Sequence, residues 1–150
     1  MYNLKTITKK VPLFVYGTLK KGERAYNRLE GSKLIAMAEL QPEYKLLNCG
    51  RYPALVKAKN GTNAISGEIY EVAKDVLENL HNYEGVSSGL FYFDYLSLGE
   101  IEIVNQPEDN LTKMMLNRSL AFGYLYVNQN ENLLEIEHWS TDFLYSLTIR

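Results

Sequence analysis

Hydrophobic and polar positions alternate along the chain in short blocks, and these blocks predict more strands than helices. Val11 to Tyr16 is an apolar run that ends at Gly17, which is typical of a buried strand leaving into a loop. Blocks of similar length predict further strands over residues 33–40, 44–47, 54–58, 65–72, 90–98, 101–104 and 119–127.

Turn signals between these blocks predict how the strands are joined. Asn60-Gly61 is a strong two-residue turn signal and predicts that the chain reverses from 54–58 into 65–72. Gly99 predicts a second turn, after which residues 101–104 pair back on the preceding strand.

Helical spacing is clearest over Lys74 to Tyr83, where apolar residues recur on one face and Gly85 follows as a stop signal. A short helix is expected over Glu23 to Leu29, stopped near Gly31. The polar segment 105–117 is interpreted as a loop or insertion, and residues 131–147 as a partly helical tail.

These elements predict an α+β fold, a small and mostly antiparallel β-barrel with one or two flanking helices. The length of 150 residues fits a single domain over 1–150, with residues 1–10 as an N-terminal extension. The mouth of such a barrel is a common place for a ligand pocket.

Composition narrows the class of protein. The chain is 46% hydrophobic and 23% charged, which is typical of a globular protein. Its one cysteine, Cys49, excludes an internal disulfide and fits a reducing compartment. No stretch is apolar enough to span a membrane, and the N-terminus lacks the apolar core of a signal peptide, so we expect a cytoplasmic protein.

Charge is unevenly distributed around a net charge of −2. Residues 1–28 carry +6 and the remainder −8. The basic end is either a solvated, lysine-rich surface or a weak indication of an anionic ligand. The overall balance does not favour nucleic-acid binding, and we expect neither a nucleic-acid nor a membrane partner. The oligomeric state stays open.

Several familiar sites are absent from the sequence. Residues 17–22 have the spacing of a phosphate-binding loop but lack the Lys-Ser/Thr that follows it. Cys49, His81 and His138 match neither a metal motif nor a nucleophile arrangement, so no metal is predicted. A glycine-containing loop after a strand nevertheless presents backbone N–H groups that can hold a carboxylate or an oxyanion.

An ordered set of motifs resembles one known family. Residues 14–22 read Phe-Val-Tyr-Gly-Thr-Leu-Lys-Lys-Gly, residues 51–56 contain Tyr-Pro, and residues 66–72 contain Gly-Glu-x-Tyr. Residues 80–85 read Leu-His-Asn-Tyr-Glu-Gly, and the likeness reaches about residue 139. Together they resemble the γ-glutamylcyclotransferase-like family, in its AIG2-like and γ-glutamylamine cyclotransferase branch.

The resemblance implies a fold, an activity and a set of site residues. It implies a small six-stranded-type barrel without metal or cofactor, which converts a small γ-glutamyl substrate to 5-oxoproline and releases an amine. Glu84 matches the catalytic glutamate of the family and is expected to act as general acid and base. The backbone of Gly17, Thr18 and Leu19, together with the hydroxyl of Tyr16, is expected to bind the substrate.

The chain also departs from the family pattern. Residues 89–94 carry no arginine where many relatives have Tyr-x-Arg, and residues 137–139 read Glu-His-Trp in place of Gly-Asp-Trp. Because of these changes, the sequence does not determine which amine the reaction releases. They also favour a second hypothesis, in which the chain is a non-catalytic module that binds a small ligand or a partner on the same fold.

Overall fold

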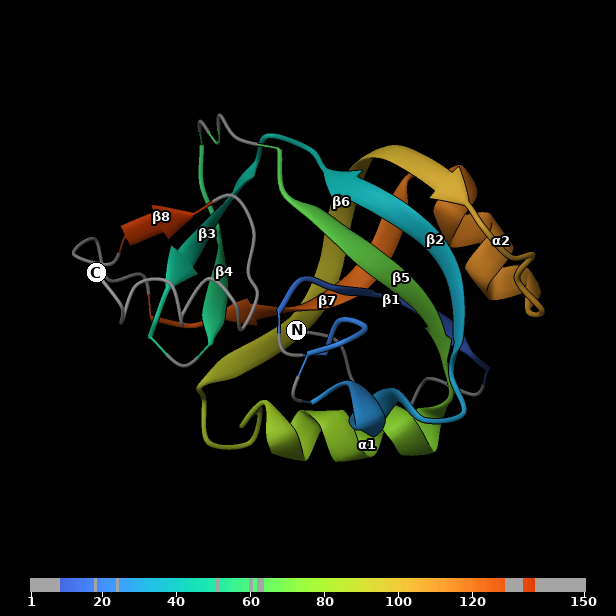
Figure 1. Cartoon of the computed structure of the whole chain (residues 1–150), viewed down its shortest axis with the longest axis horizontal. Helices are drawn as coiled ribbons and strands as arrows, with labels where there is room; N and C mark the ends of the chain where they lie inside the picture. The colour runs from blue at the N-terminus through green and yellow to red at the C-terminus, as the bar shows by residue number, and fades with distance from the viewer. Residues whose placement is uncertain are drawn as a thin grey trace.

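The computed structural model is built on a closed barrel with a small second sheet beside it (Figure 1). It describes residues 9–17, 19–23, 25–50, 52–59, 61, 64–128 and 134–136. Thr18, the residues 1–8 of the expected N-terminal extension and most of the expected tail over 131–147 lie outside these residues.

Five strands close the barrel in the order β1-β5-β2-β6-β7. All neighbours pair antiparallel except β1 and β7, which run parallel. The prediction of a mostly antiparallel barrel is therefore confirmed, with five strands in place of the six-stranded type that the resemblance implied. The strands are β1 (Val11–Val15), β2 (Lys33–Leu40), β5 (Ser66–Val72), β6 (Phe91–Ile103) and β7 (Leu120–Tyr126).

A three-stranded sheet lies beside the barrel, in the order β4-β3-β8. It contains β3 (Tyr44–Asn48), β4 (Pro53–Lys57) and β8 (Leu134–Ile136). The predicted hairpin from β4 into β5 is wrong, because β4 pairs with β3 and β5 belongs to the barrel. Gly61 lies against the backbone of Tyr44, where an added Cβ would sit 3.0 Å from the nitrogen.

The predicted turn at Gly99 is also wrong, because β6 runs through it as one long strand. The first half of β6 pairs with β7 and the second half pairs with β2. The β2 register shifts between Ala38 and Leu40, beside Gly99, whose added Cβ would stand 3.5 Å from the Glu39 carbonyl oxygen. The glycine therefore lies where the strand changes partners and not where it reverses.

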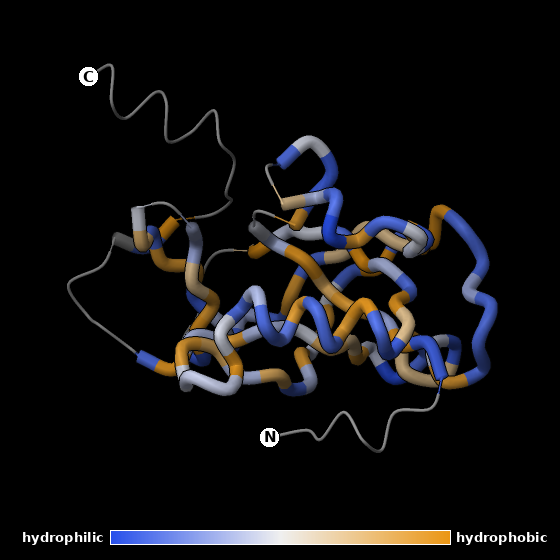
Figure 2. Tube along the Cα trace, turned by 90° about the horizontal axis from the view of Figure 1, so that it is seen from below, coloured by the Kyte–Doolittle hydropathy of each residue, from blue (hydrophilic) through white to orange (hydrophobic). Residues whose placement is uncertain are grey.

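The helices cover the barrel from two sides (Figure 1). α1 (Lys74–Tyr83) has the predicted bounds and buries Leu77 and Leu80. It crosses the front of Figure 2, where hydrophilic and hydrophobic colours alternate along its turns, as expected for an amphipathic helix. The expected short helix before Gly31 is a 3₁₀ turn, η2 (Tyr26–Leu29), packed against α1.

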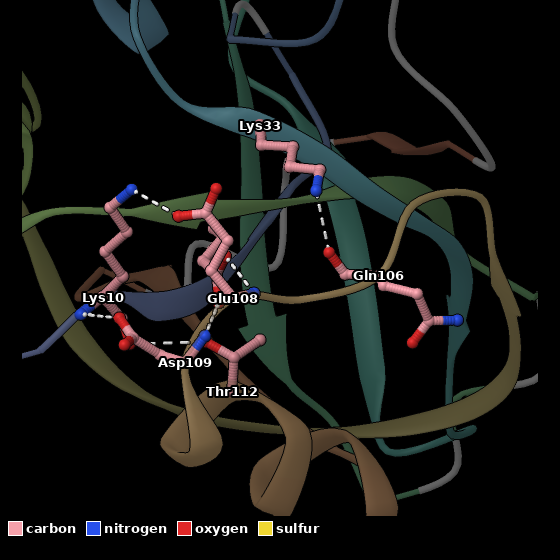
Figure 3. Close-up of polar contacts among 7 residues, drawn as sticks. Lys10, Lys33, Gln106, Glu108, Asp109 and Thr112 are labelled. Carbon is pink, nitrogen blue, oxygen red and sulfur yellow. Dashed lines mark hydrogen bonds and ion pairs between the residues drawn. The ribbon is translucent and has the colours of Figure 1, made fainter.

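The segment 105–117, predicted to be a loop, contains the helix α2 (Asn110–Asn117). Its start is fixed by Glu71, a β5 residue that is only 2% exposed, whose carboxylate accepts hydrogen bonds from the N–H groups of Glu108 (2.9 Å) and Asp109 (3.1 Å). The Asp109 carboxylate accepts from the N–H of Lys10 at 2.8 Å, and the Thr112 hydroxyl donates to the Lys10 carbonyl at 3.3 Å (Figure 3).

The core consists of apolar side chains from the barrel and from both α-helices. Val11 and Leu13 of β1, with Phe93 of β6, are fully buried in one cluster that also takes in Leu77, Leu80 and Met115. No helix among the described residues is long and apolar enough to cross a membrane. The packing holds the end of β1 and the end of α1 on a common scaffold, and the cavity described below lies between these two ends.

Candidate active site

One cavity lies where β1 and α1 end, and most of the predicted site residues line it. Its volume is about 230 Å³. Tyr16, Gly17 and Leu19, which follow β1, share its wall with Glu84, which follows α1. Thr18 belongs to the same predicted loop but lies outside the described residues. The structure thus brings Glu84 to the loop that the sequence predicted as its partner, although the two are more than 60 residues apart.

The end of α1 holds Glu84 in place. Its backbone N–H donates to the carbonyl of Leu80 at 2.8 Å, so the residue completes the last helical turn. Gly85 then takes a φ of +66°, and its N–H donates to the carbonyl of Asn82 at 3.2 Å. Because the left-handed region favours glycine, the Glu-Gly pair both ends the helix and directs the chain back towards β6.

The Glu84 carboxyl is placed in an apolar wall. Burial raises its pKa from the ordinary value to about 7, against the opposing effect of the Arg28 guanidinium. Tyr83, Leu90 and Phe91 line the same cavity and form the apolar surroundings expected for this group. A carboxyl that titrates near neutrality is suited to exchange protons with a substrate.

Arg28 reaches this wall from η2, and sequence reasoning missed it. Its guanidinium carbon lies 4.0 Å from the centroid of the Tyr83 ring, within the range of a cation–π contact. Residues 89–94 contain no arginine, and the cation that acts on Glu84 comes from η2. No sequence spacing connects Arg28 with Tyr83, so only the tertiary structure could show the pair.

Tyr16 packs across the cavity against β7. Its hydroxyl donates a hydrogen bond to the backbone carbonyl of Tyr124 at 2.6 Å. Burial, and then the nearby carboxylate of Glu84, raise the pKa of Tyr16 well above its usual value, so the phenol stays neutral. The Tyr16 hydroxyl is thus engaged with the backbone, as donor to Tyr124 and in a further backbone hydrogen bond with Leu55, so Tyr16 offers the cavity mainly its ring.

Tyr124 and His81 form a second polar pair beside the cavity, which the sequence did not reveal. The Tyr124 hydroxyl lies 2.7 Å from Nδ1 of His81, one helical turn before Glu84. Burial lowers the pKa of His81 and raises that of Tyr124, so both side chains are neutral near pH 7. The sequence predicted a strand over residues 119–127 but gave no sign that Tyr124 on this strand meets His81 on α1.

The described residues contain no group of three or more histidine, cysteine or acidic side chains that could hold a metal ion. Cys49 is half-buried, and burial raises the pKa of its thiol, which makes it a poor nucleophile. Within these residues, Glu84 is therefore the ionisable cavity group best suited to proton transfer.

The fold and the site define a class of protein, a small barrel with a carboxyl group and a backbone loop facing one cavity at its mouth. A sequence model of the family described as gamma-glutamyl cyclotransferase, AIG2-like, matches residues 13–141. The chain belongs to this family.

Two curated relatives match about half of the chain. A protein of Vibrio cholerae named "Putative gamma-glutamylcyclotransferase" is 40% identical over 74 residues, which cover 49% of this chain and 62% of that protein. Gamma-glutamylaminecyclotransferase A of Danio rerio is 30% identical over 81 residues, which cover 49% of this chain and 50% of that protein. The matched segments thus span less than two thirds of either relative.

A solved structure gives the same architecture. A mouse AIG2-like protein matches with a TM-score of 0.69 and 20% identity, over 88% of this chain and 89% of that one. At this level of identity the match shows the shared fold.

Proposed function

We propose that the chain is a γ-glutamylcyclotransferase-type enzyme that converts a γ-glutamyl amide or γ-glutamylamine to 5-oxoproline and releases the amine. The observation that carries this proposal is the meeting of Glu84 with the loop after β1 in one cavity. The family membership and the names of the two relatives support the same reaction class.

The reaction needs few groups because the substrate carries its own nucleophile. The α-amine nitrogen attacks the γ-carbonyl carbon, a new C–N bond closes the five-membered ring, and the old C–N bond to the leaving amine breaks. Intramolecular reactions held in good geometry reach effective molarities of about 10⁵ M or more, so positioning supplies much of the rate. Neither a serine or cysteine nucleophile nor a metal ion is required.

Glu84 moves the proton in this scheme. The substrate amine is largely protonated near neutral pH, so Glu84 in its carboxylate form first takes a proton from the ammonium group and frees the lone pair that attacks. Glu84 passes this proton to the leaving nitrogen, and the ring nitrogen releases its second excess proton to solvent after the ring has closed. The pKa of about 7 suits both steps, because either form of the carboxyl is readily reached at neutral pH.

The loop after β1 binds the anionic parts of the substrate. The backbone N–H groups of Gly17, Thr18 and Leu19 are proposed to hold the α-carboxylate or the oxyanion that forms at the γ-carbonyl. Donors of this kind contribute about 10²–10³-fold each in known oxyanion holes. The cavity of about 230 Å³ is smaller than the roughly 300–1,000 Å³ of typical drug-sized pockets, which favours a guest of amino-acid size.

A panel of γ-glutamyl compounds tests the proposal. Purified chain is incubated with γ-glutamyl amino acids, γ-glutamyl-ε-lysine and simple γ-glutamyl alkylamides, and release of 5-oxoproline is measured by chromatography. We expect turnover of at least one class, and a loss of about 10²–10⁴-fold in Glu84→Gln with the fold retained. Equal rates for the variant and the wild type would end the assignment of Glu84.

The same experiment distinguishes the second hypothesis. Calorimetric binding of 5-oxoproline without turnover of any substrate in the panel would favour a non-catalytic binding module.

A further inference from the structure

Strand β5 carries two glutamates that each hold a distant segment by its backbone. Glu68 accepts a hydrogen bond from the N–H of Lys21 at 2.8 Å, in the loop after β1. Glu71 accepts two from the N–H groups that precede α2. The first contact lies on the segment that directly follows the cavity-lining residues Gly17 and Leu19, and the second holds the start of the helix that covers another part of the barrel.

Barrel pairing places Glu68 beside the start of this loop. In the antiparallel pair of β1 and β5, Glu68 lies opposite Val15, the last residue of β1, and Gly17 follows two residues later. The neighbouring Gly67 lets the two strands approach closely, because an added Cβ would come within 2.5 Å of the Val15 carbonyl oxygen and of the Phe14 ring. Glu68 therefore projects from a rigid strand pair and not from a mobile loop.

The carboxylate has a second partner that fixes its direction. The hydroxyl of Tyr70, two residues along β5 on the same face, donates to the same Glu68 oxygen at 3.1 Å. The Tyr70 ring is buried and packs 6.1 Å from the ring of Tyr26 in η2. One carboxylate oxygen thus joins β5 to the loop, and the buried phenol holds that oxygen in place.

The loop itself consists of successive turns on either side of Lys21. The N–H of Lys20 donates to the carbonyl of Gly17 at 3.1 Å, and the N–H of Glu23 donates to the carbonyl of Lys20 at 2.9 Å. These short-range contacts bend the chain. Leu19 attaches the loop to the core through its buried side chain, and the bond from Lys21 to Glu68 adds a polar attachment to the barrel directly after the cavity-lining residues Gly17 and Leu19.

We propose that Glu68 is a positioning residue for the reaction, which holds the loop after β1 so that its backbone N–H groups face the substrate. The inference rests on the proposed function. A hydrogen bond to a charged acceptor is stronger than one between neutral groups, so a carboxylate suits the task of holding a single backbone N–H at the surface. Because small displacements of positioning groups cost up to about 10²-fold in rate, the loss of this contact should be visible in turnover.

Four variants separate positioning from general stability. Glu68→Ala removes the acceptor, while Glu68→Gln keeps an oxygen that can accept from Lys21. Tyr70→Phe removes the second partner and leaves the carboxylate on the loop. Glu71→Ala is the matched control, because it removes a backbone-holding carboxylate from the same strand outside the site.

Each variant is measured by kcat and KM for 5-oxoproline release, by thermal unfolding and by amide hydrogen exchange at Lys21. In Glu68→Ala we expect kcat/KM to fall about 10–100-fold and the Lys21 amide to exchange several-fold faster. The acid limb of the pH profile should stay in place, since burial and Arg28 set the charge state of Glu84. Glu68→Gln keeps an acceptor oxygen without the charge, and Tyr70→Phe leaves the carboxylate without its second partner, so both should lose less kcat/KM than Glu68→Ala. Glu71→Ala should lower Tm and leave kcat/KM of the folded chain and Lys21 exchange unchanged.

Two results would overturn the inference. One is an unchanged kcat/KM or an unchanged Lys21 exchange rate in Glu68→Ala, and the other is an equal loss of kcat/KM in the folded Glu71→Ala control. If the wild type releases no 5-oxoproline from any substrate in the panel, the proposed function fails and the catalytic role of Glu68 fails with it. If the wild type is active and Glu68→Ala has the same kcat/KM, only the positioning role of Glu68 is refuted and the proposed function stands.

Discussion

At the scale of single residues, Glu84 is subject to two opposing influences, burial that raises its pKa and Arg28 that lowers it. With the pKa at about 7, the carboxylate that accepts the substrate proton is depleted below neutral pH. We therefore expect the acid limb of kcat/KM to have an apparent pKa near 7, measured with a substrate whose own ionisation is known. A limb between pH 4 and 5, where an ordinary glutamate titrates, would contradict this prediction.

Replacing Arg28 by alanine should move this limb to higher pH. The guanidinium stabilises the charged form of Glu84, so its loss leaves burial unopposed and the pKa rises further. Arg28→Lys is the matched control, since it keeps the positive charge but not the planar group that stacks on Tyr83. The pH profiles of the three proteins give the answer, and a limb that stays in place or moves to lower pH in Arg28→Ala would refute it.

At the scale of elements, the approach of β5 to β1 depends on the absence of a side chain at Gly67. Alanine there would place its Cβ 2.5 Å from the Val15 carbonyl oxygen, and a backbone atom cannot swing aside. We expect Gly67→Ala to lower the free energy of unfolding by about 1–3 kcal/mol, the usual cost of overpacking.

Gly99→Ala is the matched control for this substitution. Its added Cβ would meet its nearest neighbour, the Glu39 carbonyl oxygen, at an ordinary 3.5 Å. Urea unfolding of both variants, analysed with a common m-value, measures the difference. Equal free energies of unfolding for Gly67→Ala and the wild type would contradict the prediction, because β1 and β5 would then accommodate the added methyl group without destabilisation.

Local signals in the sequence predicted elements better than they predicted pairing. The amphipathic spacing of α1 and the glycine after it depend on neighbours along the chain, and its bounds were predicted correctly. β6 and α2 depend on distant partners. β6 stays extended past Gly99 because it exchanges β7 for β2, and the start of α2 is held by Glu71 from another strand. Both the continuation of β6 past Gly99 and the start of α2 depend on residues far away in the sequence, so local periodicity could not predict either.

The candidate site divides in the same way. Tyr16, Gly17, Leu19 and Glu84 were predicted from motifs, and the structure places all four on one cavity. Arg28 and the pair of His81 and Tyr124 reach the wall only because η2, α1 and β7 meet there. Contacts between elements that meet only through folding leave no pattern in the sequence. The predicted site therefore lacked Arg28, His81 and Tyr124.

At the scale of the whole molecule, the ionisation of Glu84 is linked to stability. Its folded pKa of about 7 lies above the ordinary value of 4.5, so the folded state binds more protons than the unfolded state between these two pH values. The contribution of Glu84 to stability is therefore fully present below pH 4.5 and is lost as the pH rises through about 7. The cost at higher pH is about 1–3 kcal/mol, after a reduction because Glu84 is partly exposed.

Glu84→Gln tests this linkage without any assay of turnover, because glutamine has no charge to bury. At pH 8 the variant should be more stable than the wild type by about 1–3 kcal/mol, and at pH 4 the difference should largely disappear. Glu78→Gln, an exposed position on the same helix, is the matched control and should show no such pH dependence. A Glu84→Gln difference that is constant from pH 4 to 8 would mean that the carboxyl is solvated in the folded chain. If the difference grows with pH, the buried carboxyl destabilises the fold at neutral pH. Such a loss of stability is expected where a proton-transferring group is held in an apolar wall for function.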